Sequence, residues 1–165
     1  MAQGTPKAEI VLEAGIANIT GRATYPTAMI FDWDNTLIDS WSTIHAALAD
    51  TFKTFGKEPW SFEQTTANVR KSARDSFPTL FGDDWEAAKD HYIAAFEAIH
   101  LAELRPLDGA LEFISNTAKT MPLAIISNKT GRLLRAEIDH LGWGGHFVAA
   151  LGAGDAEADK PDPKP

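Results

Sequence analysis

Hydrophobic and polar positions alternate with different periods in different parts of this chain. A short apolar run over Thr27–Trp33 ends in acidic residues, which is typical of a buried parallel strand that carries chemistry at its end. The runs Pro122–Ser127 and His146–Leu151 have the same character. The pattern therefore predicts three buried strands that are well separated along the chain.

Residues 40–104 follow a helical period instead. The apolar residues that recur there at spacings of three and four, on one face of a helix, are Trp41, Ile44, Leu48, Phe52 and Phe55. Gly56 and Pro59 end this helix, and Ser61 with Gln64 forms the pattern of a capping box for the next one. This segment is predicted to be all helix, with no strand.

Helices are also predicted between the second and third strands and before the second. Asp108 can cap a helix over Gly109–Thr120, and Thr130 can cap another that Gly142 closes. Strands and helices that alternate in this way are typical of the α/β class, a Rossmann-like parallel sheet with right-handed crossovers. The helical segment is then an insertion after the first strand.

The N-terminal residues 1–26 show no clean period, and we expect an extension that is partly ordered at best. They lack the basic region and apolar run of a signal peptide. No apolar stretch approaches the ~20 residues of a membrane span. We therefore expect a soluble, cytoplasmic protein.

The composition removes several classes of function. The 165 residues carry 15 basic and 23 acidic side chains, a net charge of −8, which disfavours a nucleic acid or an anionic membrane as partner. There are no cysteines, so disulfides, thiolate metal sites and cysteine nucleophiles are excluded. The five histidines show no metal-ligand spacing. A small anionic substrate remains possible because a site can be locally positive.

Polar residues follow each predicted strand. Asp32-Trp33-Asp34 ends the first strand, Ser127-Asn128 ends the second, and an acidic, proline-rich tail follows Leu151. In parallel sheets ligands bind beyond the carboxyl ends of the strands, so we expect these groups to meet.

Three motifs in series give this chain its resemblance to a known family. They are FDWDNTLIDS at residues 31–40, IISNK at 125–129 and DKPDP at 159–163. In order and spacing they resemble the motifs of the haloacid dehalogenase superfamily, in particular the phosphoglycolate-phosphatase-like branch with a helical cap. The resemblance covers residues 27–165. It implies an α/β core at 27–39 and 105–165 and a cap at 40–104.

The first motif suits phosphate-ester chemistry on physical grounds. An aspartate such as Asp32 can attack phosphorus if a cation neutralises the repulsion from the phosphate oxygens, which gives an acyl-phosphate that water hydrolyses. Residues two apart at a strand end point to the same side, so Asp34 can donate and then accept a proton. Two adjacent carboxylates favour a hard cation such as Mg²⁺.

The resemblance assigns the remaining roles. Catalysis is expected from Asp32, Asp34 and Lys160, phosphate binding from Thr36, Ser127 and Asn128, and Mg²⁺ binding from the Asp32 carboxylate and the Asp34 carbonyl. A hydroxyl and an N–H that precede a helix N-terminus also form a natural phosphate site. Asn35 stands where the family often has glycine, a mild departure because asparagine tolerates left-handed backbone.

Two further features stay open at this point. Arg70, Lys71 and Arg74 form a basic patch that is more simply a solvated face than a clamp for a substrate carboxylate. Lys129 is the last residue of the second motif and fits either a supporting role behind the site or a place on the surface.

The family's fourth motif, an acidic pair that completes the metal site, is missing, because the sequence ends at Pro165 just after the third. Asp155, Glu157 and Asp159 precede Lys160 and lie in the wrong place to substitute. We therefore expect a fragment of a longer reading frame, with an open edge on the first strand. Alone it should be marginally stable and have little or no phosphatase activity.

The leading functional interpretation is a Mg²⁺-dependent phosphomonoesterase that acts on a small phosphorylated metabolite through an aspartyl-phosphate. Two alternatives are a phosphosugar mutase on the same scaffold and a non-catalytic binding protein that keeps the fold. The expected partner is a small phosphate ester, with neither a nucleic acid nor a membrane. Oligomeric state and substrate identity are not contained in the sequence pattern.

Overall fold

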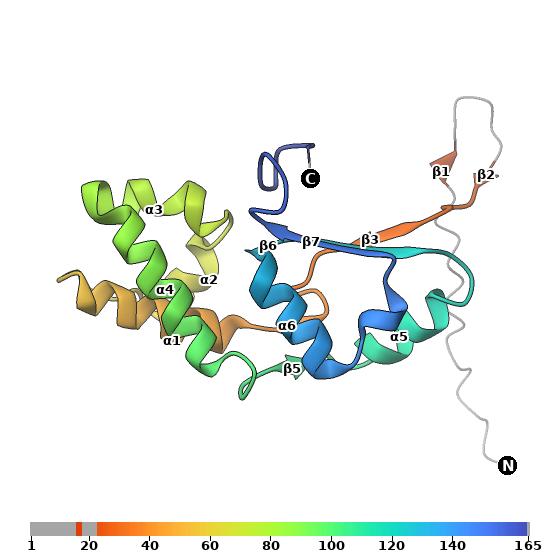
Figure 1. Ribbon diagram of the computed structural model, residues 1–165, viewed down its shortest axis with the longest axis horizontal. Coiled ribbons are helices and arrows are strands. Elements are labelled where there is room, and N and C mark those ends of the chain that lie inside the picture. Colours follow the sequence, from red (N-terminus) through yellow and green to blue (C-terminus); the bar gives the residue numbers. More distant parts are fainter. Residues whose placement is uncertain (1–15, 18–22, 165) are drawn as a thin grey trace, which may run out of the picture.

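A three-stranded parallel sheet forms the centre of the α/β part of the molecule. In the computed structural model, which describes residues 16–17 and 23–164, the strands are β3 (Met29–Phe31), β6 (Leu123–Thr130) and β7 (Ala149–Ala153). Their order is β3-β6-β7, and both neighbouring pairs are parallel (Figure 1). The predicted α/β class and parallel sheet are confirmed.

One face of this sheet is covered by α5 (Ala110–Thr117) and α6 (Gly131–Leu141), which lie together beneath it in Figure 1. Two right-handed crossovers that move in the same direction across a sheet place both helices on the same face. Ile114 and Leu134 on these helices pack with Ile125 of β6, and all three are fully buried. Ile30 of β3 is 62% exposed, so this side chain lies away from the core.

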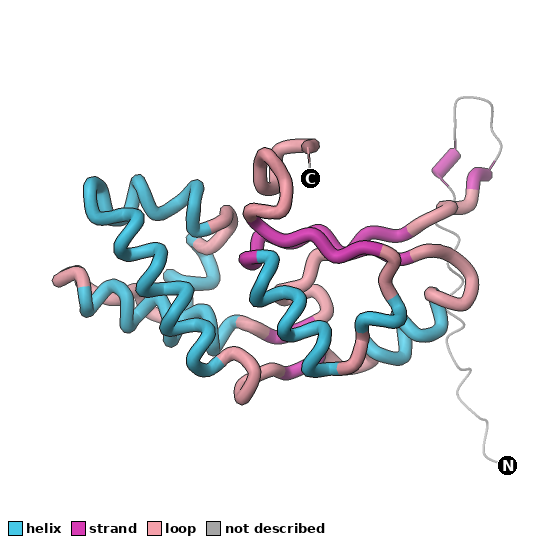
Figure 2. Tube along the Cα trace, in the orientation of Figure 1, coloured by secondary structure: helices cyan, strands magenta, loops and turns pink. Residues whose placement is uncertain are grey.

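Residues 40–104 form a separate group of helices, the helical insertion. It contains α1 (Trp41–Thr54), α2 (Phe62–Asn68), α3 (Ala73–Phe81), the 3₁₀ turn η1 (Gly82–Asp84) and α4 (Trp85–Ile99). Figure 2 shows these helices gathered at one end of the molecule, beside the strands. Ser61 and Gln64 form the predicted capping box.

The insertion has its own hydrophobic core. Phe52, Phe77, Phe81 and Phe96 are buried there. The Phe81 ring packs at a tilt against the rings of Phe52 and Phe77, and the Phe96 ring packs at a tilt against that of Tyr92. Leu133 of α6 belongs to the same cluster, whereas Leu134 belongs to the core beneath the sheet. Helix α6 therefore stands between the two cores, with adjacent faces turned to each.

A short antiparallel pair that the pattern did not predict marks both ends of the insertion. β4 (Ile38–Asp39) pairs with β5 (Arg105–Pro106) where the chain leaves for the insertion and where it returns. Two-residue strands have no detectable period, so this pairing depends on the tertiary fold. This pairing holds together the two segments that connect the insertion to the α/β part of the molecule.

Several predicted boundaries are wrong. β6 continues to Thr130, because Thr130 pairs with Ala153 of β7 after an irregularity in the register. β7 begins only at Ala149, after the 3₁₀ turn η2 (Gly144–His146). Neighbouring strands set these limits, and the local sequence does not contain them.

One predicted helix cap is wrong, and two lie at the predicted residues. Asp108 caps nothing, because Gly109 is the N-cap of α5, with φ 79°, and makes no side-chain cap bond. Thr130 is the N-cap of α6, as predicted, although its side chain makes no cap bond. Gly142 ends α6 in the left-handed conformation, as predicted.

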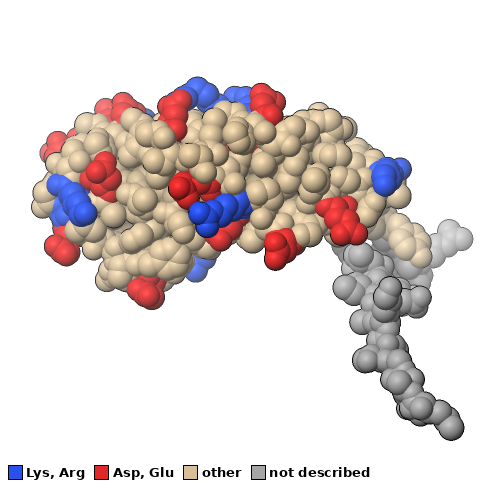
Figure 3. Space-filling view, turned by 90° about the horizontal axis from the view of Figure 1, so that it is seen from below, with Lys and Arg blue, Asp and Glu red and all other residues tan. Residues whose placement is uncertain are grey.

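At the N-terminal end, β1 (Ile16–Ala17) pairs antiparallel with β2 (Ala23–Thr24). Of the extension predicted over residues 1–26, residues 1–15 and 18–22 lie outside the described residues. Among the described helices, none has the length and apolar character needed to cross a membrane. On the face that carries α5 and α6, basic and acidic side chains are interspersed (Figure 3).

Candidate active site

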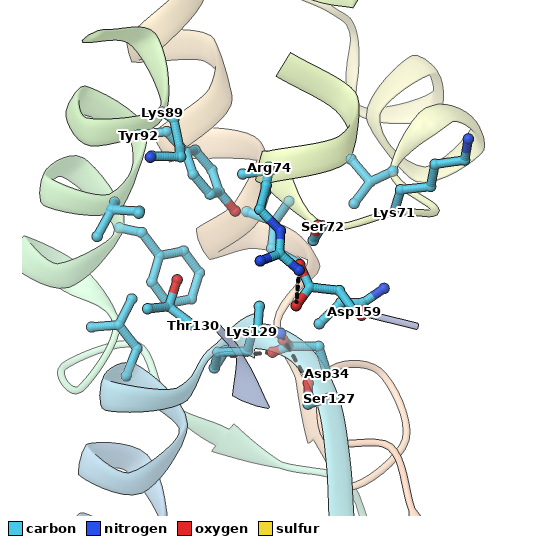
Figure 4. A pocket seen from close by; sticks show the side chains of 18 of the residues that line it. Asp34, Lys71, Ser72, Arg74, Lys89, Tyr92, Ser127, Lys129, Thr130 and Asp159 are labelled. Atoms are coloured by element: carbon cyan, nitrogen blue, oxygen red, sulfur yellow. Dashed lines mark hydrogen bonds and ion pairs between the residues drawn. The ribbon is translucent and has the colours of Figure 1, made fainter. Parts of the chain in front are cut away.

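A cavity of about 350 Å³ lies between the carboxyl ends of the strands and the helical insertion. Figure 4 shows side chains of the strand ends, including Asp34, Ser127 and Lys129, facing Arg74 and Tyr92 of the insertion. The polar or charged residues that line it are Asp32, Asp34, Asn35, Arg70, Lys71, Ser72, Arg74, Lys89, Tyr92, Ser127, Asn128, Lys129, Thr130 and Asp159. The strand ends do converge on one site, as the topology predicted.

Asp32 is the first residue after β3, and its side chain is 44% exposed at the cavity. Its Oδ1 atom accepts a hydrogen bond from the Trp33 N–H at 2.7 Å and lies 3.0 Å from Nζ of Lys160. The carboxylate is therefore accessible, oriented by the backbone and next to a cation.

Asp34 is held more tightly. Its Oδ1 atom accepts from the Ser40 hydroxyl at 2.5 Å and lies 2.8 Å from Nζ of Lys129. Burial raises the pKa of the Asp34 carboxyl, although the charge and hydrogen bond of Lys129 act in the opposite direction. The net effect is a pKa of Asp34 above the ordinary value of an aspartate.

The turn between the two aspartates and α1 explains their placement. The Trp33 carbonyl accepts from the N–H groups of Leu37 and Ile38, and Asn35 adopts a left-handed φ of 59°. The Asn35 side chain accepts from the Ser40 N–H at 3.1 Å. Asn35 therefore adopts the left-handed backbone conformation expected at a position where the family often has glycine.

Ser127 and Asn128 also line the cavity, but within strand β6 and not at a helix N-terminus as the sequence suggested. α6 begins at Gly131, because β6 extends through Thr130. The Ser127 hydroxyl accepts from the Lys129 N–H at 3.1 Å. The prediction that these residues bind phosphate therefore depends on their position near the end of β6, and not on the N-terminus of α6.

Asn128 connects the second motif to the third. Its Nδ2 donates to the backbone carbonyl of Lys160 at 3.1 Å, while its buried Oδ1 has no hydrogen-bond partner. Lys160 thereby keeps its backbone at the end of β6 while its side chain, 31% exposed, reaches Asp32. The structure brings both residues to the site; their chemical roles remain predictions.

Thr36 is the predicted substrate-binding residue that the structure leaves aside. It is exposed in the turn after Asp34, and it is absent from the lining of the cavity. Its N–H lies 3.3 Å from the Trp33 carbonyl, so its backbone belongs to the tight turn. A direct contact with phosphate therefore has no geometric support here.

Lys129 and Glu137 form a buried centre that the sequence interpretation missed or left open. Lys129 has a side chain only 4% exposed, 4.6 Å above the Phe96 ring, and its Nζ lies 2.6 and 2.7 Å from the two Glu137 oxygens. A detectable signal existed: Glu137 lies four residues after Leu133, on an otherwise buried face of α6. A carboxylate on such a face requires a partner.

Asp159 is a second residue whose place at the site the sequence interpretation missed, since it was considered there only as a substitute for the missing acidic pair. Its side chain is 2% exposed, forms an ion pair of 2.8 Å with Arg74, and accepts from the Gly154 N–H at 3.2 Å. Its other oxygen, Oδ2, is buried without a partner. The acidic tail residue next to Lys160 thus links the strand end to the insertion.

The basic patch of the insertion lies at the cavity. Arg70, Lys71 and Arg74 are exposed, as expected for a solvated face, and they also line the cavity opposite the two aspartates. Tyr92 lies there too, and burial, with Asp34 and Glu137 nearby, raises the pKa of its phenol. The insertion therefore brings positive charge to the cavity.

The residues present can hold a magnesium ion only in part. Within residues 16–17 and 23–164, no group of three or more His, Cys, Asp or Glu side chains is arranged to bind a metal. Mg²⁺ keeps several waters and commonly uses one or two carboxylates together with substrate phosphate. The exposed Asp32 carboxylate fits such a ligand, and the Asp34 carbonyl is the second one that the family resemblance implies.

Comparison with known proteins identifies the same family. The model of the haloacid dehalogenase-like hydrolase family matches residues 29–165. A phosphoglycolate phosphatase from Aquifex aeolicus is 28% identical over 142 residues, which are 83% of this chain and 65% of that protein. Another from Agrobacterium fabrum is 29% identical over 154 residues, 87% of this chain and 65% of that protein. The chain thus spans less than two thirds of the length of these relatives.

A solved structure has the same fold. A protein from Bacteroides fragilis, assigned to the haloacid dehalogenase-like hydrolases, superposes with a TM-score of 0.77. The two are 21% identical, and the match covers 84% of this chain and 69% of that one. At this identity the likeness establishes the fold alone.

Proposed function

Because this chain belongs to the haloacid dehalogenase-like hydrolase family, we propose that it provides the nucleophile and general acid of a Mg²⁺-dependent phosphomonoesterase. The observation that carries this proposal is the position of Asp32. Its carboxylate is exposed at the cavity, 3.0 Å from the Lys160 ammonium, and Asp34 lines the same cavity two residues later. This is the arrangement that phosphoryl transfer to a carboxylate requires.

Asp32 and Asp34 can carry out the bond changes and proton transfers of the proposed hydrolysis. An Asp32 oxygen attacks phosphorus and forms an acyl-phosphate, while the bond to the ester oxygen breaks and the leaving alkoxide takes the proton of Asp34. Asp34, now ionised, takes a proton from water as that water hydrolyses the acyl-phosphate, which restores both carboxyl groups. Magnesium, when bound, neutralises the phosphate oxygens that would otherwise repel the attacking carboxylate.

The surroundings of both aspartates support these roles. Burial raises the pKa of Asp34 above its ordinary value, which is the direction that a proton donor requires. Asp32 is more exposed and faces an ammonium group, conditions under which a carboxylate can act as a nucleophile. Lys160 also offsets negative charge that develops on the transferring phosphoryl group.

For the substrate we propose a small phosphate ester with a second anionic group, as in phosphoglycolate. Two observations support it: relatives described as phosphoglycolate phosphatases, and the cationic side chains of Arg70 and Lys71 at the cavity, beside an Arg74 that is ion-paired with Asp159. A phosphosugar mutase on this scaffold would instead depend on a sugar bisphosphate. Dependence of turnover on added sugar bisphosphate separates the two.

The decisive experiment is a panel of phosphate monoesters assayed with Mg²⁺ on the full natural reading frame, beside Asp32→Asn. Asp32→Asn keeps the shape of the side chain and removes the nucleophile. We expect Mg²⁺-dependent turnover that falls by at least about 10³-fold in the variant, since the covalent route is lost. Equal turnover in both proteins, or none in the wild type, contradicts the phosphatase proposal and favours a non-catalytic binding protein.

A further inference from the structure

Glu137 is buried at the meeting point of three segments. Its residue is 1% exposed on α6, and its two carboxylate oxygens accept from three different side chains. The Trp33 indole N–H donates to Oε2 at 2.6 Å, and the His100 ring Nδ1 lies 2.8 Å from Oε1. Lys129 lies within 2.7 Å of both oxygens.

Each of these partners belongs to a different functional part. Trp33 stands between Asp32 and Asp34 in the first motif. Lys129 is the last residue of the second motif on β6 and pairs with Asp34 at 2.8 Å. His100 is the C-cap of α4, where the insertion ends. Glu137 is thus linked to the first motif, the second motif and the insertion at once.

Burial restricts the Glu137 carboxylate to one orientation. A buried carboxylate without partners is strongly destabilising, whereas here each oxygen has two partners. The side chain therefore has one orientation that satisfies it, and its partners are fixed in turn. Trp33 is fully buried and packs edge-on against Trp143 at 5.8 Å, so its indole has little freedom to compensate for a lost bond.

We propose that Glu137 is a positioning residue for the proton donor, an inference that rests on the proposed function. Glu137 holds the Lys129 ammonium against Asp34, and it holds the indole of Trp33, the residue between the two aspartates. Both contacts orient the Asp34 carboxyl toward the leaving group. Lys129 does not gain this position from Asp34 alone, because a flexible four-carbon side chain has many rotamers and the Glu137 oxygens select one of them.

A second ion pair shows what a merely structural link between the same elements looks like. Arg132 of α6 and Glu97 of α4 also join the insertion to the core. Their side chains are 58% and 45% exposed, and neither residue lines the cavity. Glu97→Gln is therefore a matched control for Glu137→Gln: each removes one carboxylate between neighbouring helices, but only one lies behind Asp34.

The first test is spectroscopic and needs no turnover. In ¹H–¹⁵N spectra of the full natural reading frame, the Trp33 indole signal is identified by its loss in Trp33→Phe. We expect Glu137→Gln to shift this signal, because the bond to a carboxylate is replaced by one to a neutral amide. Glu97→Gln should leave it unchanged.

The second test uses the leaving group. A proton donor matters for an alkyl phosphate, whose alkoxide needs a proton, and much less for p-nitrophenyl phosphate. We expect Glu137→Gln to lower kcat by about 10- to 100-fold on the alkyl substrate, by less than about 3-fold on the nitrophenyl ester, and to change KM little on either. A structural defect would lower both rates equally.

The outcomes are distinguishable. If Glu137→Gln does not fold, Lys129→Gln takes its place, with the same dependence on leaving group expected. The positioning role is overturned if Glu137→Gln keeps the wild-type kcat, or if it loses the same factor of kcat on both substrates. If Asp32→Asn is inactive in the same assay, the proposed function still stands. An unshifted Trp33 signal in Glu137→Gln overturns the positioning role as well. A wild-type protein without turnover overturns both proposals.

Discussion

The ammonium group of Lys160 lies 3.0 Å from Oδ1 of Asp32, although the two residues belong to opposite ends of the described chain. The contact exists because Asn128 binds the Lys160 carbonyl at the tip of β6, which places the last segment beside the first strand. A lysine in an acidic, proline-rich tail is thereby brought to the proposed nucleophile.

This relationship predicts a large effect of Lys160→Met on turnover of the full reading frame. Removing a positioned charge that stabilises a developing anion lowers kcat by about 10²–10³-fold. Lys164→Met is the control, since Lys164 pairs at 3.1 Å with the exposed Glu157 and not with the cavity. Steady-state kinetics on both variants decide the matter, and equal rates would remove Lys160 from the mechanism.

Gly152 occupies a position in β7 where the structure has no room for a side chain. A Cβ atom at this position of β7 would lie 2.4 Å from Cα of Gly131 and 2.5 Å from the carbonyl oxygen of Lys129. Since these are backbone atoms, they cannot turn aside, and we expect Gly152→Ala to lower the free energy of unfolding by about 2 kcal/mol or more. Urea denaturation of the purified protein measures it.

Gly145 serves as the comparison for that substitution. A Cβ atom there meets nothing within 4 Å, and the residue lies in η2, away from the β6–β7 contact. Gly145→Ala should change the free energy of unfolding by less than about 0.5 kcal/mol. Similar losses in both variants would mean that β6 and β7 do not approach each other this closely.

The sequence predicted those parts of the fold and site that local pattern determines. The apolar run at Leu123–Ser127 lies in the central strand β6, because a strand between two neighbours of a parallel sheet needs continuous apolar residues. The run at Met29–Phe31 also forms a strand, but at the edge of the sheet, where Ile30 is 62% exposed. Asp32, Asp34 and Ser127 meet because parallel strands end at the same edge. Topology alone was sufficient to bring them to one cavity.

What the sequence did not contain depends on contacts between distant elements. Glu137 could not be assigned to Lys129 without knowing how α6 is rotated between the two hydrophobic cores. Asp159 was considered only as a substitute for the missing acidic pair and was given no other role, because its partner Arg74 lies on the insertion. Such pairings follow from packing geometry, which a single sequence does not display.

Asp155 predicts a pH-dependent contribution to stability. Its carboxylate accepts from Arg135 at 2.6 and 3.1 Å and from the Gly152 N–H at 2.8 Å, and the Arg135 hydrogen bonds lower the pKa of Asp155. The folded state therefore favours the ionised form. This contribution is fully present above the ordinary pKa of an aspartate and is lost as the pH falls through the lowered value.

We expect Asp155→Asn to reduce the free energy of unfolding at pH 7 by about 1 kcal/mol or less, since Arg135 is half exposed. The difference from wild type should narrow as the pH is lowered from about 4. Urea denaturation at a series of pH values tests both statements. A difference that stays constant or widens toward acid pH would mean that the pair with Arg135 does not form in solution.

Arg74 and Asp159 give the last prediction, a test of how the insertion is attached above the site. Arg74 is 43% exposed, whereas the Asp159 side chain is 2% exposed and already has one oxygen without a partner. Arg74→Met therefore leaves a buried carboxylate without its cation, and we expect it to destabilise the protein by about 1–3 kcal/mol. Arg70→Met, at the same cavity, should cost less than about 0.5 kcal/mol because Arg70 is exposed.

Asp159→Asn combined with Arg74→Met completes a double-mutant cycle. The neutral amide no longer needs the guanidinium, so the double variant should be more stable than Arg74→Met alone, with a coupling of about 1 kcal/mol or more. Thermal and urea unfolding of the four proteins provide the values. If the two substitutions add without coupling, the ion pair does not hold the insertion to the strand end, and Arg74 is then free to face an anionic substrate in the cavity.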